Sequence, residues 1–469
     1  MLAPGSGFCL FQEGKMGIGS SGGGARKSDR LAEIVYRSIS DLIPNPRNPR
    51  RHTDKQIRQL ARSIEALRFN VPILVDSNLN VLSGHARILA CKYLGLTEVP
   101  TICLDHLTPS QAKAFMITDN RLTENADWDD RLLGELLKEL SLEDLDFSIE
   151  VTGFDMGEID LRIQGLSEVS ESEHDPADVL PTDQPGIRVS SPGDLWLLND
   201  HRVYCGNSLE DVAYKNLMDG SLADMIFADP PYNVPIDGHV GGLGSIHHRE
   251  FAMASGEMSA SEFTDFLTKA FVLLVKYSAD GSLHYLCIDW RHLRELLAAG
   301  GKAYTELKNL AVWIKDKPGM GSLYRSQHEL IFVYKNGRGS HRNNIQLGQF
   351  GRNRSNCWHY PGANSFGRKG DEGNLLALHP TVKPVALIAD AILDCTARGD
   401  IVLDAFLGSG STIIAAERVG RRCYGIEIDP LYVDTIVRHW ESLSGRLAVH
   451  QPTGRSFKEL EANAEKRNG

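Results

Sequence analysis

The chain has 469 residues, of which 42% are hydrophobic and 24% charged, and its formal net charge is −11 at pH 7. This composition is ordinary for a soluble globular protein of about two or three domains, and no apolar run approaches the length of a membrane span. The acidic balance argues against a uniformly basic coat for nucleic acid, but it is compatible with a local basic groove. The eight cysteines include no C-x-x-C pair, so we expect neither disulfides nor a zinc site, and a reducing cytoplasm fits.

The first half of the chain divides by composition. Residues 1–29 hold a Gly/Ser-rich stretch without an apolar core, which we expect to be a disordered leader and not a signal peptide. Residues 34–165 form a smaller α+β domain, with strand candidates VPILV and VPTICL and a helix over residues 54–67 that Thr53 caps. Residues 166–190 are acidic, rich in Ser and Pro and without periodicity, which is typical of a linker.

Residues 191–447 show a longer series of alternating strands and helices. The strand candidates are DLWLL, RVYCG, DMIFA, SLHYLCI, AVWIK, ELIFVY, DIVLDAF and RCYGIEI. Helical patterns lie between several of them, near residues 261–277, 290–299, 384–396 and 411–419. This alternation predicts an α/β domain on a mostly parallel, doubly wound sheet. Residues 448–469 are expected to form a charged tail that frays.

The segment DMIFADPPYN (224–233) places an acid, two prolines and a tyrosine directly after a buried strand. Proline has no backbone N–H, so the strand must stop near Asp229. The result is a stiff turn with a carboxylate, free carbonyls and an aromatic ring at a strand's carboxyl end, where open α/β sheets bind ligands. Alone, such a turn is also compatible with a simple strand stop.

A glycine-bearing turn follows a second strand far downstream. An apolar strand ends at Asp404, Gly408 and Gly410 give a tight turn, and Thr412 opens a helix. The turn lacks the G-K-[ST] ending of a phosphate loop. Glu427 ends the next strand about 20 residues later, where a carboxylate can accept hydrogen bonds from ribose hydroxyls.

Four segments resemble the motifs of S-adenosylmethionine-dependent DNA amino-methyltransferases. They are DPPYN (229–233), HPTVKP (379–384), DAFLGSGST (404–412) and GIEIDP (425–430). Their order, with the catalytic motif before the cofactor motif, is similar to the permuted class often called beta. The resemblance covers roughly residues 191–445 and implies a Rossmann-like S-adenosylmethionine-dependent methyltransferase fold.

Elementary chemistry agrees with the resemblance at the first motif. The exocyclic amine of a base is a weak nucleophile, because its lone pair is delocalised into the ring, and a group that accepts its hydrogens concentrates electron density on nitrogen. The turn offers a carboxylate, a rigidly held carbonyl and a flat ring for stacking. The base must leave the double helix to reach it, so base flipping is implied. The expected catalytic residues are Asp229, Pro230, Pro231 and Tyr232.

The resemblance also implies a cofactor and the residues that bind it. In the family the glycine turn holds the methionine part of S-adenosylmethionine, the acid of the next strand holds the ribose, and HPTVKP closes the pocket. The segment CGNSLED is similar to the family's adenine-side contact. The implied cofactor-binding residues are Asp404, Phe406, Gly408, Gly410, Thr412, Glu427, His379, Lys383, Asn207 and Ser208, and no metal is expected.

The stretch between Ile331 and Gly370 contains seven lysines and arginines and no aspartate or glutamate. Aromatic residues are interleaved with these arginines, and the resembled family keeps its target-recognition region at this place. We expect residues 338–370 to contact double-stranded DNA, with arginines on phosphates or guanine edges. A solvated basic face is the alternative. The predicted contacts are Arg338, Arg342, Arg352, Arg354, Trp358, Arg368 and Lys369.

The N-terminal block resembles the ParB N-terminal domain, which has the ParB/sulfiredoxin fold. In that family a P-x-N-P-R arm and a G-E-R-R-x-x-A turn surround a nucleotide phosphate, and the matching residues here are Asn45, Pro46 and Arg47 and the segment SGHARILA (83–90). Gly84 can open a helix N-terminus that binds an anion, with Arg87 as its clamp. A nucleotide or anion site at Arg47, Gly84 and Arg87 is therefore one expectation. Because His85 and Ala86 replace the family's glutamate and arginine, a structural or DNA-docking module is the other.

Taken together, the sequence predicts a cytoplasmic enzyme that transfers a methyl group from S-adenosylmethionine to the N6 amine of a flipped adenine in duplex DNA. Adenine is favoured because aspartate at the first motif position goes more often with adenine in the family, and serine with cytosine. One alternative is a cytosine-N4 methyltransferase. Another is a nucleotide-gated ParB-like DNA-binding protein with a vestigial methyltransferase half. Double-stranded DNA is the expected partner, with a nucleotide at the ParB-like domain and a homodimer as further expectations.

Overall fold

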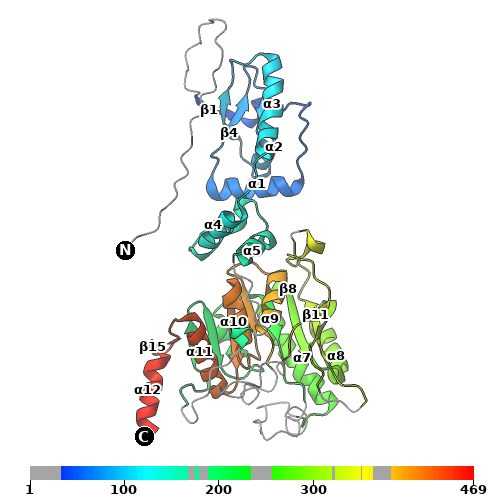
Figure 1. The fold of residues 1–469 in the computed structure, drawn as a ribbon, viewed down its shortest axis with the longest axis vertical. Coiled ribbons are helices and arrows are strands. Elements are labelled where there is room, and N and C mark those ends of the chain that lie inside the picture. Colours follow the sequence, from blue (N-terminus) through cyan, green and yellow to red (C-terminus); the bar gives the residue numbers. More distant parts are fainter. Residues whose placement is uncertain are drawn as a thin grey trace, which may run out of the picture. The chain divides into compact units, whose positions relative to one another are not determined.

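The structure, a computed structural model, describes residues 33–166, 175–178, 188–233, 256–319, 323–349, 351–362 and 382–468. The predicted leader lies outside these ranges, as does most of the predicted linker. The chain divides into two compact units, Met1–Asp127 and Trp128–Gly469, which are described separately (Figure 1).

The first unit is an α+β fold around a four-stranded sheet. In spatial order its strands are β1 (Ile34–Ser38), β4 (Glu98–Cys103), β2 (Ile73–Val75) and β3 (Val81–Ser83). Its helices are α1 (Asp54–Leu67), α2 (His85–Tyr93) and α3 (Pro109–Glu124), with a short 3-10 turn at Ile39–Asp41. The predicted cap of α1 is confirmed, because the Thr53 side chain accepts a hydrogen bond from the Gln56 N–H at 3.2 Å.

The second unit is built on a mixed sheet whose described strands have the order β11-β9-β10-β8-β7-β12-β13-β6-β5-β14-β15. The central run β8-β7-β12-β13-β6 is parallel throughout, whereas β10 is antiparallel to both of its neighbours. The strands are β5 (Leu195–Leu198), β6 (His201–Cys205), β7 (Ala223–Ala228), β8 (Ser278–Ile288), β9 (Glu306–Ile314), β10 (His328–Lys335), β11 (Cys357–His359), β12 (Ile401–Asp404), β13 (Arg422–Glu427), β14 (Val449–His450) and β15 (Arg455–Ser456).

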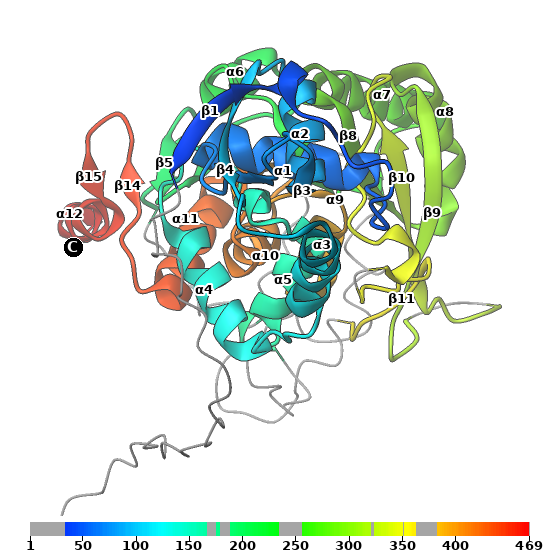
Figure 2. The ribbon, with the colours of Figure 1, turned by 90° about the horizontal axis from the view of Figure 1, so that it is seen from above.

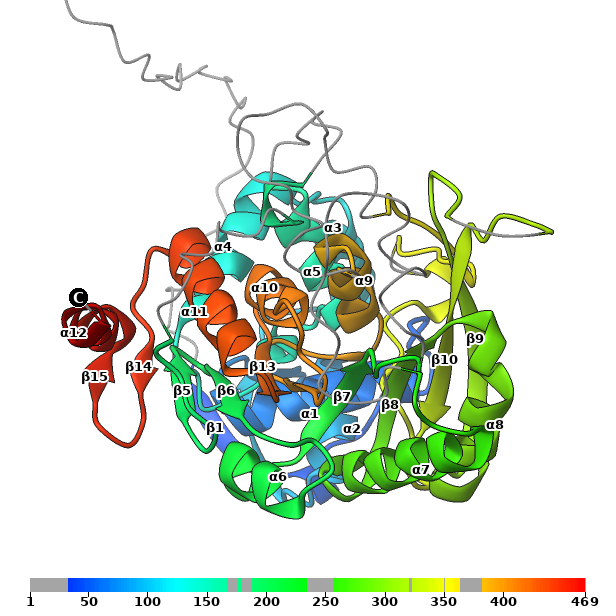
Figure 3. The same ribbon diagram turned by 90° about the horizontal axis from the view of Figure 1, so that it is seen from below.

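Helices cover both faces of this sheet, as Figure 3 shows. On one face lie α6 (Asp211–Met218), α7 (Ala260–Lys276) and α8 (Leu293–Ala303), and on the other α9 (Val385–Cys395), α10 (Ser411–Val419) and α11 (Pro430–Ser444). The predicted α/β class with a doubly wound sheet is thereby confirmed. Within the described ranges no helix is both long enough and apolar enough to span a bilayer.

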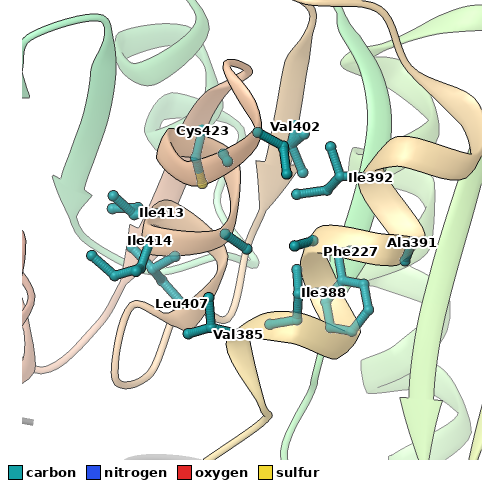
Figure 4. Packing of buried hydrophobic residues seen from close by; sticks show 14 of the residues in the cluster. Phe227, Val385, Ile388, Ala391, Ile392, Val402, Leu407, Ile413, Ile414 and Cys423 are labelled. Atoms are coloured by element: carbon teal, nitrogen blue, oxygen red, sulfur yellow. The ribbon is translucent and has the colours of Figure 1, made fainter. Parts of the chain in front are cut away.

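One apolar core joins strands β7 and β12 to helices α9 and α10. Figure 4 shows Phe227 of β7 beside Ile388 and Ile392 of α9, with Val402 of β12 and Ile413 of α10 in the same cluster. Burying one such side chain stabilises a fold by about 1.5–3 kcal/mol relative to leaving it exposed. This packing fixes the ends of β7 and β12, and with them the loops that follow, relative to the start of α9.

The structure differs from the frayed tail expected over residues 448–469. Strand β14 pairs with β5 and β15 with β14, and α12 (Phe457–Asn468) follows beside them (Figure 2). Phe457 is buried, and its ring centroid lies 5.2 Å from that of Trp196. Lys458, Glu459 and Lys466 of α12 are exposed, whereas Glu461 pairs with Arg438 at 2.8 Å beside the buried Phe457, and composition alone does not separate these positions.

A helical segment precedes the large sheet in the second unit. It consists of α4 (Asp130–Leu142), a 3-10 turn at Ile149–Thr152 and α5 (Met156–Gln164). Asp160 of α5 is 0% exposed and accepts two hydrogen bonds from Arg421, at 2.9 and 2.7 Å. Residues 128–165 therefore pack with the large sheet, whereas the domain prediction had joined them to the N-terminal domain.

We expect Asp160→Ala to destabilise the second unit by about 3–5 kcal/mol, because Arg421 would be left as a buried charge without its carboxylate. Thermal unfolding followed by circular dichroism measures this as a fall in the midpoint. The control is Glu135→Ala, which removes the partner of the exposed Arg131 on α4 and should leave the midpoint unchanged. Equal midpoints for the two variants would contradict a stabilising role for the buried pair.

Candidate functional site

The predicted catalytic and cofactor residues follow neighbouring parallel strands. β7 and β12 pair with Ile226 opposite Leu403, so Asp229 comes directly after one strand end and Asp404 forms the other. β13 pairs with β6, and its last residue is Glu427. The carboxyl ends of these parallel strands meet at one side of the sheet, here called the carboxyl edge and defined by Asp229, Asp404 and Glu427, and such an edge is where open α/β sheets bind ligands.

Asp229 is held from two directions in the turn after β7. The Tyr232 hydroxyl donates to Asp229 Oδ1 at 2.5 Å, and Lys383 Nζ donates to Oδ2 at 2.5 Å. Lys383 Nζ also lies 3.2 Å from Tyr232 Oη and 5.5 Å from the centroid of the tyrosine ring. Both carboxylate oxygens thus have a partner within the chain, and Lys383, predicted to bind cofactor, lies among the predicted catalytic residues.

Asn233 completes the turn in a left-handed conformation, with φ of 53°. Asparagine adopts this region more readily than most residues. Its side-chain oxygen accepts hydrogen bonds from the N–H groups of Gly256 and Met258, both at 3.1 Å, and its amide donates to the Met258 carbonyl at 2.7 Å. The last residue of the motif therefore fixes the start of the chain that leads into α7.

Glu329 and Lys315 belong to the same cluster, and the sequence reasoning missed both. Glu329 Oε2 lies 3.1 Å from Lys383 Nζ and accepts from the Tyr232 hydroxyl at 3.2 Å, while its Oε1 accepts from Lys315 Nζ at 2.5 Å. Glu329 is near the start of β10, which runs antiparallel to β8. The start of β10 therefore lies at the carboxyl edge, where β8 and the strands parallel to it end. In the sequence, the one sign of Glu329 and Lys315 was that charged residues stand at the ends of the apolar runs that form β9 and β10.

The cluster contains two carboxylates and two lysines in a largely buried space, and this sets their proton affinities. Burial, opposed by Lys383 and reinforced by Glu329, raises the pKa of Asp229. Burial also acts to raise the pKa of Glu329, but Lys383 and Lys315 outweigh it and hold that pKa at about 2. Asp229 is therefore the carboxylate of this cluster that takes up a proton first.

Asp404 anchors the glycine turn that follows β12. Its Oδ2 accepts from the Thr412 hydroxyl at 2.6 Å and its Oδ1 from the Phe406 N–H at 3.0 Å. Gly408 and Gly410 have φ of 55° and 85°, a region in which a side chain is strained. The Gly408 N–H donates to Glu427 Oε2 at 2.8 Å, so the turn and the acid of the next strand form one unit.

The chemistry of this unit fits S-adenosylmethionine, which carries an ammonium group, a sulfonium and two ribose hydroxyls. Asp404 and Glu427 are both buried, and within the described part of the chain neither forms an ion pair. Burial raises the pKa of each to about 7. Two carboxyl groups that lack a cation and keep free acceptor sites are complementary to a cationic ligand with hydroxyl donors.

The remaining predicted cofactor residues lie beside this unit or outside the described ranges. Asn207 and Ser208 follow β6, whose last residue Cys205 is opposite Glu427. The Asn207 side chain stays within its own turn, accepting from the Leu209 N–H at 2.9 Å, and Ser208 is buried. His379 lies outside the described residues.

The predicted DNA contacts are not brought together. Because β10 runs antiparallel, it carries the chain away from the carboxyl edge over about 20 Å between Glu329 and Lys335. The N–H of Arg338 then bonds to Asp280 at the start of β8, and the Arg342 side chain pairs with Glu150 at 3.1 Å. Arg338 and Arg342 thus lie at the edge opposite to Asp229.

The next three predicted contacts are engaged inside the protein. The Arg352 side chain is 8% exposed and pairs with Asp394 at 2.9 Å, and Arg354 pairs with Asp390 at 2.8 Å. Trp358 is buried, with the Arg354 guanidinium 4.8 Å from its ring centroid. In this conformation these three side chains stabilise the subdomain around β11. Arg368 and Lys369 lie outside the described residues.

The predicted anion site of the first unit is built partly as expected. Gly84 precedes α2 with φ of 104°, and a side chain there would meet Ile73 at 2.6 Å. Arg87, however, donates to the carbonyls of Val71 and Pro72, at 2.5 and 3.0 Å. The Arg47 N–H bonds within its own arm, to Asn45. The Arg87 side chain is thus hydrogen-bonded to the segment before β2, and the anion site stays a prediction.

Comparison with known families decides the class of the protein. Residues 223–438, which span the carboxyl edge, match a family described as DNA methylase. Residues 24–120 match the ParB N-terminal domain, and residues 131–192 match the ParB-methyltransferase HTH domain. The chain contains a DNA methylase domain of the N6/N4 family and a ParB-like N-terminal domain. The predicted family and the predicted cofactor, S-adenosylmethionine, are thereby confirmed.

The methylase is similar to known proteins over each of its parts. It is 26% identical over 256 residues to the type II methyltransferase M2.MboI of Moraxella bovis, covering 52% of this chain and 88% of that protein. Over 84 residues it is 37% identical to the ParB-like nuclease domain-containing protein YnaK of Escherichia coli (strain K12), covering 18% of this chain and 95% of that protein. The crystal structure of the M1.HpyAVI–SAM complex is 18% identical with a TM-score of 0.36, over 50% of this chain and 98% of that chain.

Asp404 and Glu427, which are predicted to bind the cofactor, each have a pKa raised to about 7, so this prediction implies that cofactor binding depends on pH. Below about pH 7 a carboxyl group must lose its proton before it can hold a cation or accept two hydroxyls, so affinity falls on acidification, by at most about tenfold per unit and per group. We expect the Kd for S-adenosylmethionine to fall as the pH rises from 6 to 8. Calorimetry in two buffers of different ionisation heat should detect proton release at pH 6.

Asp404→Asn should weaken binding and flatten this pH dependence, because the amide does not titrate. Asp219→Asn, which changes an exposed acid beside α6, is the control and should bind as the unaltered protein does. A Kd that is constant from pH 6 to 8 in the unaltered protein would contradict the assignment of these carboxyl groups to the cofactor.

Proposed function

We propose that the methylase transfers a methyl group to the N6 amine of a flipped adenine in duplex DNA, with Asp229 accepting the hydrogens of that amine. The observation that carries this proposal is the position of Asp229, held by Tyr232 and Lys383 at the same edge as two buried carboxyl groups. The proposed acceptor of the amine, Asp229, therefore lies at the same edge of the sheet as Asp404 and Glu427, which suit a cationic cofactor.

The target amine is activated by the hydrogen bonds that it donates. Asp229 accepts one N–H and the Pro230 carbonyl another, which localises the nitrogen lone pair. The N–C bond to the methyl group forms as the bond between that carbon and sulfur breaks, and the amine gives one proton to Asp229. Because burial raises the pKa of Asp229, its carboxyl group can hold this proton before passing it to water.

Tyr232 supplies the surface on which the flipped base stacks. Its hydroxyl is fixed between Asp229 Oδ1 and Glu329 Oε2, which orients the ring next to the acceptor of the amine. Stacking on an aromatic side chain is a common way to hold an extruded base, and it contributes about 1–3 kcal/mol per base. Pro231 stiffens the segment between acceptor and ring.

The cofactor is held by the unit around the glycine turn. Asp404 and the backbone of Phe406, Gly408 and Gly410 hold its methionine part with Thr412 in support, and Glu427 holds the ribose hydroxyls. Asn207 and Ser208 line the adenine side, and His379 and Lys383 belong to the segment that closes the pocket. When bound, S-adenosylmethionine supplies an electrophilic methyl group on a sulfonium.

Duplex DNA approaches the carboxyl edge in this proposal, and two basic residues of the chain are its proposed contacts. The described chain leaves this edge at Gly362, whose N–H donates to Asp316 at 2.8 Å, and returns at Val382, directly before Lys383. Arg368 and Lys369 lie between these points in the sequence. Their contacts to phosphates would steer the duplex without selecting its sequence.

The choice of adenine rests on the first residue of the catalytic turn. Aspartate at this place goes more often with adenine in the resembled family, and serine with cytosine. Both bases present an exocyclic amine that donates two hydrogens, so the same acceptors serve either one. Cytosine-N4 methylation is therefore the competing assignment, and the identity of the methylated nucleoside separates the two.

The decisive assay is transfer of tritiated methyl from S-adenosylmethionine to unmethylated genomic DNA, followed by nucleoside analysis. We expect label in N6-methyladenine. Asp229→Ala should lower the rate at least about 100-fold while cofactor binding persists, because the amine loses its charged acceptor. Asp265→Asn on α7, an exposed acid, is the control.

Label in N4-methylcytosine would overturn the choice of base and leave the site intact. If the Asp229 variant retained the rate of the control, the proposed role of the catalytic turn would be wrong. No transfer by the unaltered protein, with cofactor bound, would favour the DNA-binding protein with a vestigial methyltransferase half.

A further inference from the structure

The catalytic acceptor is occupied by its own neighbours in this structure. Asp229 Oδ1 accepts from Tyr232, and Oδ2 from Lys383, each at 2.5 Å. A target amine that donates to Asp229 competes with these two bonds, one of them to a cation. Displacing a buried ammonium group without giving it another partner is strongly unfavourable, so the donors need a second acceptor.

Glu329 is placed to be that acceptor. Its Oε2 lies 3.1 Å from Lys383 Nζ and 3.2 Å from Tyr232 Oη, so it already contacts both groups that hold Asp229. The other oxygen of Glu329, Oε1, accepts a hydrogen bond from Lys315 Nζ at 2.5 Å. This bond fixes the carboxylate and leaves Oε2 directed at Lys383 and Tyr232. We propose that Glu329 is a positioning residue that takes over Lys383 and Tyr232 when the target amine engages Asp229.

The charge balance of the cluster permits this exchange. Two carboxylates, Asp229 and Glu329, face two ammonium groups, Lys383 and Lys315, and the count is the same before and after Lys383 shifts towards Glu329. The distances to Oε2 are already those of long hydrogen bonds, so the exchange requires only small shifts of side chains. Among the described residues, Lys383 keeps a carboxylate partner throughout, and Asp229 exchanges the ammonium group for an N–H of the target amine.

The alternative is that Glu329 only stabilises the fold through its ion pairs. This alternative predicts that its loss lowers the folding midpoint and all steps of the reaction together. The exchange instead predicts a selective loss in the chemical step, because Lys383 then has Asp229 as its sole carboxylate in the cluster and competes with the amine. The proposal rests on the methyl transfer proposed above.

The test compares Glu329→Gln with a matched control on the same pair of strands. Glu306 of β9 also contacts two lysines, Lys308 at 3.0 Å and Lys335 at 3.4 Å, but at the end of β10 remote from Asp229. Glu306→Gln therefore removes the same kind of charge from the same strand pair. Steady-state methyl transfer to genomic DNA gives kcat and the KM values for both substrates, and thermal unfolding gives the midpoint.

We expect Glu329→Gln to lower kcat at least about tenfold, with the KM values for S-adenosylmethionine and DNA unchanged within about twofold. Glu306→Gln should keep the kcat of the unaltered protein. Glu329→Asp, which restores a carboxylate one methylene shorter, should recover part of the lost rate. The activity of the unaltered protein in the same assay reports on the proposed function, so a failure there is separate from any effect of Glu329.

Two results would overturn the exchange. One is a kcat for Glu329→Gln within about twofold of that of Glu306→Gln. The other is a fall in kcat accompanied by equal changes in both KM values and by a lower unfolding midpoint, which is the pattern of a purely structural residue.

Discussion

The buried contact between Lys383 and Asp229 holds the site together, since it joins segments 154 residues apart in the chain. A buried ion pair stabilises only when its geometry is good and the remaining charges are also paired. Here that condition is met by Glu329 and Lys315, which complete the cluster, and by the apolar core that positions β7 and α9. The position of the turn thus depends on the packing beneath it, where Phe227, Ile388 and Ile392 belong to one buried apolar cluster.

The antiparallel strand β10 has two consequences for function. Its start brings Glu329 to the carboxyl edge among the ends of parallel strands. Its end removes the following basic residues to the opposite edge, where Arg338 and Arg342 make bonds within the protein. One reversal of strand direction therefore both brings Glu329 into the cluster around Asp229 and takes Lys335, Arg338 and Arg342 to the opposite edge of the sheet. The distribution of charged residues along the sequence does not reveal that β10 separates Glu329 from Arg338 and Arg342.

The sequence predicted the parts of the fold that local patterns determine. The helix over residues 54–67 and its Thr53 cap are confirmed, as is the α/β class, because apolar period and capping chemistry act within a few residues. From the resemblance, the segments DPPYN (229–233) and GIEIDP (425–430) could both be assigned to the carboxyl edge of the sheet. Glu329 and Lys315 could not, because their meeting with Lys383 is set by strand order and direction. The ion pair of Arg352 could not be predicted either, because its partner Asp394 lies on α9.

The short described part of the predicted linker shows where composition fails as a guide to structure. Asp178 accepts a hydrogen bond at 2.8 Å from the N–H of Val385, the first residue of α9, and Asp175 pairs with Arg418 of α10. A carboxylate at a helix N-terminus satisfies a free N–H and interacts favourably with the helix dipole. Since Val385 is only two residues beyond Lys383, this acid supports the segment that carries Lys383. A stretch that is acidic and without periodicity can therefore support a candidate active site, because it acts through single contacts and not through a repeating pattern.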